Sequence, residues 1–128
     1  MRRWMLTAVI AVALIAAIFG QSCNANGEQK AEEIARDFIK NCATFQYDGM
    51  EDTLKLVETL YPDIENAWQF IFHFESYHAG YGDRTGQILA QVITPHEAII
   101  TVENGEVKSA VMDEKWDMVN QKMLSEGG

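Results

Sequence analysis

The sequence predicts an α+β domain in which an N-terminal helix packs on a curved antiparallel sheet of four or five strands, followed by a short C-terminal helix. Three observations support this fold class. Apolar residues follow a helical spacing over residues 31–42, aromatic residues occupy every second position over 68–74, and Asn104-Gly105 separates two apolar runs. The 128 residues suffice for one such domain and are too few for two.

The chain begins with the pattern of an export signal. Two arginines precede an uncharged apolar run over residues 5–19, which is shorter than the ~20 residues of a membrane-spanning helix. We therefore expect residues 1–22 to be a signal peptide and residues 23–128 to be a single domain, and we favour this over an uncleaved anchor.

The first cysteine stands where a lipoprotein would carry its lipid. Cys23 follows the small Ser22, although Gly20 occupies the position at which leucine is usual. We favour lipidation of Cys23, with plain cleavage nearby as the alternative. Cys42 lies on the apolar face of the predicted helix, so we expect a buried thiol first, a disulfide with Cys23 second and a reactive nucleophile last.

The first helix and the aromatic strand have clear periodicities. The residues that share one helical face are Ala31, Ile34, Ala35, Phe38, Ile39 and Cys42. Residues 50–60 fit a strand or a helix, and we favour a strand that ends before Pro62. Trp68, Phe70, Phe72 and Phe74 alternate with polar or smaller residues, which indicates the wall of a core; a stacking platform for sugars or bases is the alternative.

Three further strands and a helix complete the predicted fold. One strand is expected over residues 86–94, and two more form a hairpin around Asn104-Gly105, which suits a two-residue turn. Counting outward from this turn pairs Val102 with Val107, Ile100 with Ser109, and Ala98 with Val111. A short helix is expected over residues 114–124.

The order of elements is similar to that of cystatin-like and NTF2-like small domains. Separately, the segments HAGYGDRTGQILAQVITPH, ITVENGEVKSAV and KWD resemble small exported prokaryotic proteins, some of them lipoproteins. This second resemblance covers about residues 66–120 and implies no activity.

The charge of the chain excludes one class of partner. Residues 1–22 hold two of the ten basic residues and none of the nineteen acidic ones, so the remainder has a formal charge of −11. A nucleic-acid ligand requires a basic patch, and we therefore expect no nucleic acid as a partner. Contact with a membrane is expected only through the N-terminal lipid or anchor.

The segment HAGYGDRTGQ, residues 78–87, is the richest in functional side chains. Its three glycines suggest a phosphate loop, but a strand follows in place of the helix that such loops require. A metal site of His73, His78 and His96 with Asp83 is disfavoured. Strand alternation separates His73 from His78, and the strand expected over residues 86–94 holds His78 and His96 apart. We predict no metal and no cofactor.

These observations favour a binding domain over an enzyme. We predict an exported, lipid-anchored domain at the cell surface that holds a protein or small ligand with Tyr77, Tyr81, Arg84 and His96. One alternative is a small hydrolase or isomerase that uses His78 and Asp83 as acid and base. Another is a peptidase inhibitor, by analogy with the cystatin-like pattern. Asp83 and Arg84 are also expected to hold the segment in shape by hydrogen bonds.

Overall fold

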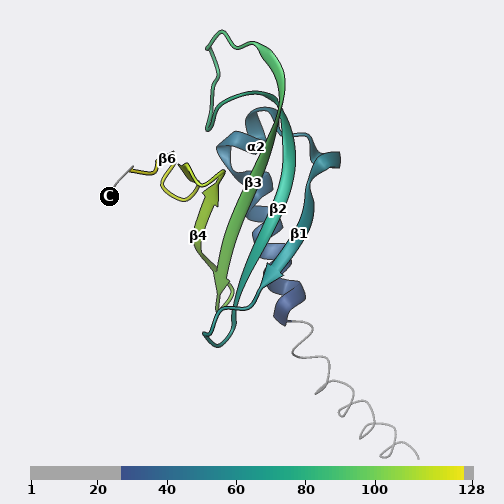
Figure 1. Ribbon diagram of the computed structural model, residues 1–128, viewed down its shortest axis with the longest axis vertical. Coiled ribbons are helices and arrows are strands. Elements are labelled where there is room, and N and C mark those ends of the chain that lie inside the picture. Colours follow the sequence, from purple (N-terminus) through teal and green to yellow (C-terminus); the bar gives the residue numbers. More distant parts are fainter. Residues whose placement is uncertain (1–26, 126–128) are drawn as a thin grey trace, which may run out of the picture. The chain divides into compact units, whose positions relative to one another are not determined.

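The computed structural model describes residues 27–125, and the packing reported below concerns the compact unit that begins at Ala31. An N-terminal helix over residues 27–41 is followed by elements whose bounds are α2 (Ala43–Asp48), a 3₁₀ turn (Glu51–Thr53), β1 (Lys55–Leu60), β2 (Ala67–His78), β3 (Gln91–Glu103), β4 (Glu106–Met112), β5 (Trp116–Asp117) and β6 (Lys122–Met123). The strands form one antiparallel open sheet in the order β1-β2-β3-β4-β5-β6, with the helix on one face (Figure 1). The predicted α+β class is confirmed.

The core lies between the N-terminal helix and one face of the sheet. Ala31, Ala35, Ile39 and Cys42 are buried at the helical spacing that the sequence predicts. The buried sheet residues that join them are Phe70, Phe72, Phe74, Ala98, Ile100, Val102, Ala110 and Met112. The aromatic alternation of β2 therefore forms the wall of a core, as expected.

The stretch over residues 50–60 contains a strand, as the sequence favours. A single 3₁₀ turn precedes β1, which pairs with β2. Gly49 sits at the entry to this stretch, in an isolated bridge with Ser76. A side chain at Gly49 would meet the ring of Phe45 at 2.4 Å, so the close approach of α2 to this residue requires glycine.

The predicted C-terminal helix is wrong. The segment instead turns back twice to form β5 and β6, the last strands of the sheet. Asp113 and Glu114 have left-handed backbone angles, with φ of 55° and 60°, which no right-handed helix accommodates. The Asp117 carboxylate then accepts bonds from the backbone of Val119 and Asn120, and such side-chain bonds favour a turn over a helix.

Two details of the predicted strands are also wrong. The strand expected over 86–94 is the first part of β3, which begins at Gln91 and continues through Pro95 to Glu103. Pro95 lies beyond the last β3 residue that pairs with β4, Ala98, so its missing N–H leaves no bond to β4 unfilled.

The hairpin register departs from the count made from the turn. Val102 pairs with Val107 as predicted, but a bulge follows, and Ile100 pairs with Ala110 in place of Ser109. Ala98 likewise pairs with Met112 in place of Val111. The extra residue shifts β4 by one position, so Ala110 and Met112 are buried.

Candidate functional site

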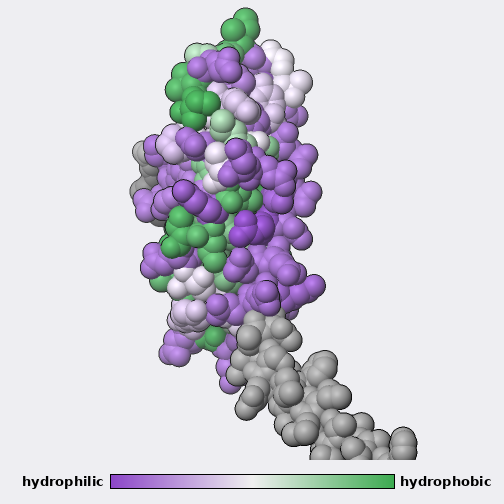
Figure 2. All heavy atoms as spheres, turned by 90° about the vertical axis from the view of Figure 1, so that its right-hand side faces the viewer, coloured by the Kyte–Doolittle hydropathy of each residue, from purple (hydrophilic) through white to green (hydrophobic). Residues whose placement is uncertain are grey.

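An arm, residues 77–93, projects from one end of the sheet, where the ends of β2 and β3 lead into a loop over residues 79–90 (Figure 1). β1 pairs with β2 only as far as His73, and β4 pairs with β3 only as far as Ala98. The large apolar side chains exposed on the arm are Tyr77, Ile88, Val92 and Ile93. Ile88 is completely exposed, and hydrophobic surface gathers at this end of the molecule (Figure 2).

Arg84 braces the base of the arm from the inside. Only 2% of this residue is exposed, and its guanidinium lies 4.6 Å from the centre of the Tyr47 ring. Nε donates to the carbonyl of Gly82, and Nη1 donates to the carbonyls of His78 and Ala79. Nη2 donates to the Thr44 carbonyl and to Asp48. All five N–H donors of the side chain are thereby used, so Arg84 has none left for a ligand.

Asp48 is the carboxylate that joins Arg84 to His78. Its Oδ1 accepts from Arg84 at 2.9 Å, and its Oδ2 accepts from the backbone N–H of His78 at 2.7 Å and contacts Nδ1 of the same ring at 3.0 Å. Burial of this carboxylate is compensated by three polar contacts. The acid–base pair expected between His78 and Asp83 is replaced by a pair between His78 and Asp48.

Asp83 itself is exposed and acts locally. It accepts hydrogen bonds from the backbone N–H and the hydroxyl of Thr85. The hydrogen bond from the Thr85 hydroxyl is the main cause that lowers the pKa of Asp83 below its usual value. The expectation that Asp83 and Arg84 hold the connection in shape by hydrogen bonds is confirmed.

A serine, a histidine and an aspartate form a continuous chain of contacts beside the arm. Ser76 Oγ lies 3.1 Å from His96 Nε2, and His96 Nδ1 lies 2.6 Å from Asp113 Oδ2. The Ser76 hydroxyl donates to the carbonyl of His78, so it accepts from His96. Every contact is satisfied when both ring nitrogens of His96 donate.

This order of residues is that of a hydrolytic triad, but its environment is that of a structural network. Ser76 is completely buried, and the His96 side chain is almost so. The hydroxyl proton that a base would remove is already bonded to a backbone carbonyl. A substrate carbonyl therefore has no access to Ser76 in this arrangement.

Tyr81 closes the same network from the arm. Its hydroxyl donates to Asp113 at 3.0 Å, and its ring stacks on Trp116 with 5.5 Å between centroids. Burial and the neighbouring carboxylate raise the pKa of Tyr81 to about 12. Burial alone would raise the pKa of Asp113, but hydrogen bonds from His96, the Glu97 backbone and Tyr81, with the charge of His96, lower it overall.

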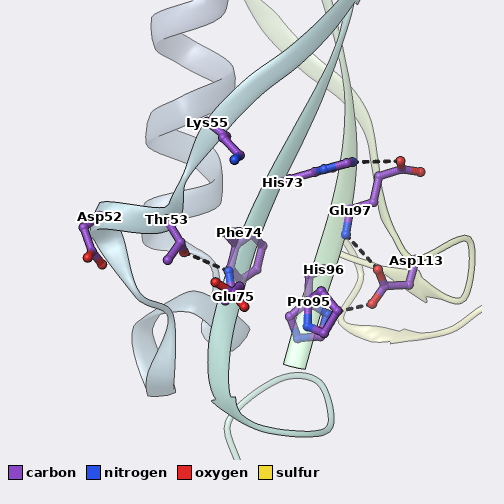
Figure 3. Close-up of a pocket in the computed structure, with 10 residues that line it drawn as sticks. All are labelled: Asp52, Thr53, Lys55, His73, Phe74, Glu75, Pro95, His96, Glu97 and Asp113. Carbon is purple, nitrogen blue, oxygen red and sulfur yellow. Dashed lines mark hydrogen bonds and ion pairs between the residues drawn. The ribbon is translucent and has the colours of Figure 1, made fainter. Parts of the chain in front are cut away.

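A groove of about 630 Å³ lies beside the base of the arm (Figure 3). Its lining residues are Asp52, Thr53, Lys55, His73, Phe74, Glu75, Pro95, His96, Glu97 and Asp113. His73 and Glu97 face each other across β2 and β3, with 3.1 Å between Nε2 and Oε2. Glu75 and Pro95, which line the groove, pair directly. The register of β2 and β3 shifts just beyond them, between Ser76 and His78, where the arm begins. The groove and the arm are therefore adjacent.

The remaining candidate chemistry finds little support in the geometry. Within residues 27–125, no group of three or more His, Cys, Asp or Glu side chains could hold a metal ion. Gly80 and Gly82 have positive φ, as a phosphate loop would need, but the Gly82 N–H is bonded to the Thr44 hydroxyl. That donor is therefore not available to an anion.

The two cysteines fall on different parts of the chain. Cys42 is a free, buried thiol, and burial is the main cause that raises its pKa. It belongs to the core, as the sequence favours. Cys23 and the expected signal peptide lie outside the described residues. No helix within the described part of the chain is both long and apolar enough to cross a membrane.

Of the four side chains expected to bind a ligand, the structure leaves one exposed. Tyr77 is on the surface, whereas Tyr81, Arg84 and His96 use their polar atoms inside the molecule. Sequence reasoning missed the partners of this network, which are Thr44, Asp48, Ser76 and Asp113. Ser76 could have been identified from the sequence. It continues the alternation of buried residues in the aromatic strand, and a buried hydroxyl needs hydrogen-bond partners.

Comparison with known proteins identifies no family. No family model matches the chain, and neither a curated protein nor a solved structure matches it significantly.

Proposed function

We propose that this chain is an extracytoplasmic binding domain that holds a protein partner on the arm and the groove beside it. It is tethered near Cys23 by a lipid or released by cleavage there. The observation that carries the proposal is the exposed apolar surface of Tyr77, Ile88, Val92 and Ile93 on an arm whose base is braced. Several exposed apolar side chains on one projecting segment are typical of a site that another molecule covers.

The bracing supports a binding role because it lowers the cost of association. A loop that becomes ordered only on binding loses conformational entropy at that moment, and the loss weakens affinity. Here the connection is held by the five bonds of Arg84 and by the Tyr81 hydroxyl. The backbone next to Tyr77 is thus held before the partner arrives, and the loop that carries Ile88 starts from this braced segment.

Catalysis is the weaker proposal for this site. The Ser76–His96–Asp113 chain is buried, and His78 is paired with Asp48 and the Arg84 network. The groove offers side chains for recognition, such as Lys55 and Glu75, without an aligned nucleophile. Recognition requires only complementary surface, which the arm and groove provide.

Site-specific photo-crosslinking in the native cell tests the proposal. A photoreactive residue at Ile88 or Tyr77 should give one adduct of constant mass, whereas the same residue at Val119, an exposed site outside the arm and groove, should give none. The adduct is then identified, and its affinity for the purified chain is measured with and without Ile88→Ser. Equal crosslinking at all three positions, or affinity unchanged by Ile88→Ser, would overturn the proposal.

Intact mass of the membrane-extracted protein tests the tether separately. Lipidation adds a diacylglycerol and a further acyl chain to a chain that begins at Cys23. A mass that corresponds to an unmodified chain starting after residue 23 would show plain cleavage, and the binding proposal would then apply to a secreted domain.

Peptidase inhibition is a second candidate, favoured by the projecting shape of the arm. A narrow projecting loop with exposed apolar side chains can enter a cleft that a flat surface cannot. Residual activity of general peptidases after incubation with the chain tests this, with Ile88→Ser as the matched variant. Unchanged peptidase activity at micromolar chain excludes inhibition for the peptidases tried.

A further inference from the structure

The sheet has an open edge at β1. Within the described residues β1 has a single neighbour, β2, so one side of its backbone is available to another strand (Figure 1). An unpaired edge of this kind is a template for an additional strand. Large apolar residues on and just after this strand are exposed, namely Val57, Leu60, Tyr61 and Ile64.

A bulge in β1 places two opposite charges on the same face. Lys55 pairs with His73 and Glu58 pairs with Ile71, with the register shift between them. Because His73 and Ile71 are two residues apart on β2, Lys55 and Glu58 point to the same side of the sheet. Without the extra residue, a spacing of three would send them to opposite faces. Neither makes an ion pair within residues 27–125.

This arrangement is complementary to itself. When two copies of β1 pair antiparallel about a two-fold axis near Val57, Lys55 of one copy lies opposite or diagonal to Glu58 of the other. Symmetry makes the contact twice, and opposite charges on neighbouring strands stabilise the pair. A parallel pairing in the same register would instead place like charges together.

We propose that the β1 edge binds a second copy of this chain as an antiparallel strand, which joins two six-stranded sheets into one continuous sheet. Val57 lies close to Val57 of the second copy, and the two copies of Leu60 lie at opposite ends of the contact. Figure 2 looks onto the side of the molecule where β1 lies and shows hydrophobic surface at mid-height between hydrophilic areas. The contact uses none of the exposed apolar residues of the arm. Lys55 also lines the groove, whereas Glu58 does not, so Glu58→Lys is the reversal that leaves the groove lining unchanged.

The same features have an opposite interpretation that experiment can distinguish. A bulge and a charged residue on an edge strand are also devices that prevent pairing. If they prevent it, reversing one charge does not weaken association, and reversing both has no special effect. If they specify a dimer, each single reversal places like charges side by side and the double reversal restores the pair.

Cysteine crosslinking of the full chain in its native membrane tests the proposal. Val57→Cys places a thiol near the two-fold axis, and Val119→Cys is the matched control because the two valines are 44% and 48% exposed. We expect a disulfide-linked dimer for Val57→Cys at several times the level of Val119→Cys, measured on non-reducing gels against the wild-type background.

Charge exchange in the Val57→Cys chain completes the test. Lys55→Glu alone and Glu58→Lys alone should each weaken dimerisation about tenfold, since two symmetric contacts are lost. Lys55→Glu with Glu58→Lys should restore it, and Lys108→Glu on the exposed end of β4 should change nothing. Equal crosslinking of Val57→Cys and Val119→Cys, or a double reversal that fails to restore dimerisation with the fold intact by circular dichroism, overturns the proposal.

Discussion

Replacement of Arg84 by alanine should destabilise this domain more than any other single charge removal at the arm. The guanidinium is buried and makes five hydrogen bonds, one of them to Asp48. Arg84→Ala leaves the Asp48 carboxylate, whose side chain is 5% exposed, without its cation. It also removes the donors from four backbone carbonyls at the junction of α2 and the arm.

The magnitude follows from the buried ion pair. Removing one partner of such a pair costs about 3 to 5 kcal/mol, because the remaining charge is uncompensated. A domain of this size is typically stable by about 5 to 15 kcal/mol, so the loss is about a fifth or more of the total. Arg84→Lys keeps the charge but has only three donors and no planar fork, and we expect about 2 kcal/mol.

Urea unfolding followed by tryptophan fluorescence measures these values. Trp116 stacks on Tyr81 within the network, so its emission reports the region directly. Arg36→Ala is the matched control, since Arg36 makes a half-exposed ion pair with Glu32 and a contact with the Phe72 ring. That control should cost about 1 kcal/mol.

Equal costs for Arg84→Ala and Arg36→Ala would refute the reasoning. Such a result would mean that Asp48 is solvated once the arginine is removed, and that the arm is not braced by this network. Hydrogen exchange at residues 78–87 distinguishes a local opening of the arm from a change in global stability, because only the former exposes this segment alone.

Four further outcomes are expected. Tyrosinate absorbance should show one step near pH 12 that Tyr81→Phe removes; because the folded pKa of Tyr81 is raised from 10.0 to about 12, its stabilising contribution is complete below pH 10 and is lost between pH 10 and 12. The lowered pKa of Asp113 contributes stability above its unfolded value of 3.8 that is lost as the pH falls further, and Asp113→Asn should flatten this part of the acid unfolding curve. Cys42 should react with a thiol reagent only after unfolding, because its thiol is buried and burial raises its pKa. Ser76→Ala should lower the free energy of unfolding by about 1 to 3 kcal/mol, since His96 loses a buried partner, and should leave partner binding within twofold.

Periodicity was sufficient to predict the helix and the central strands. A helix or strand that buries one face has apolar residues at a regular spacing, once per turn in a helix and at every second residue in a strand. The buried residues Ala31, Ala35 and Ile39 have the first spacing, and Phe70 and Phe72 have the second.

The prediction of a C-terminal helix was wrong. Trp116, Val119 and Met123 share a helical spacing, but Val119 and Met123 are exposed. The left-handed backbone conformation of Asp113 determines the direction in which the chain continues. The sequence does not show which aspartate adopts this conformation.

The location of the candidate site could be predicted from the sequence, but the hydrogen-bond partners of its residues could not. Residues 78–87 do contain the side chains that organise the arm. Their distant partners come from 30 to 40 residues away, as with Asp48 for His78 and Thr44 for Arg84. Such pairings depend on how α2 and β4 meet β2 and β3, which local spacing does not determine. The bulge in β4 is a similar case, because one inserted residue shifts the register of every following pair.

The polar residues of the arm therefore cannot supply binding energy without first giving up their internal bonds. Breaking the Arg84–Asp48 pair alone would cost about 3 to 5 kcal/mol, more than a new surface ion pair returns. The four exposed apolar side chains carry no such cost. Ile88 is completely exposed, whereas Tyr77, Val92 and Ile93 are already about half buried. Burying what remains exposed of all four contributes roughly 4 to 7 kcal/mol, against about 4 to 15 kcal/mol for the lost freedom of association. Contact with Ile88 alone is thus too little for stable binding, and a partner must cover Tyr77, Val92 and Ile93 as well.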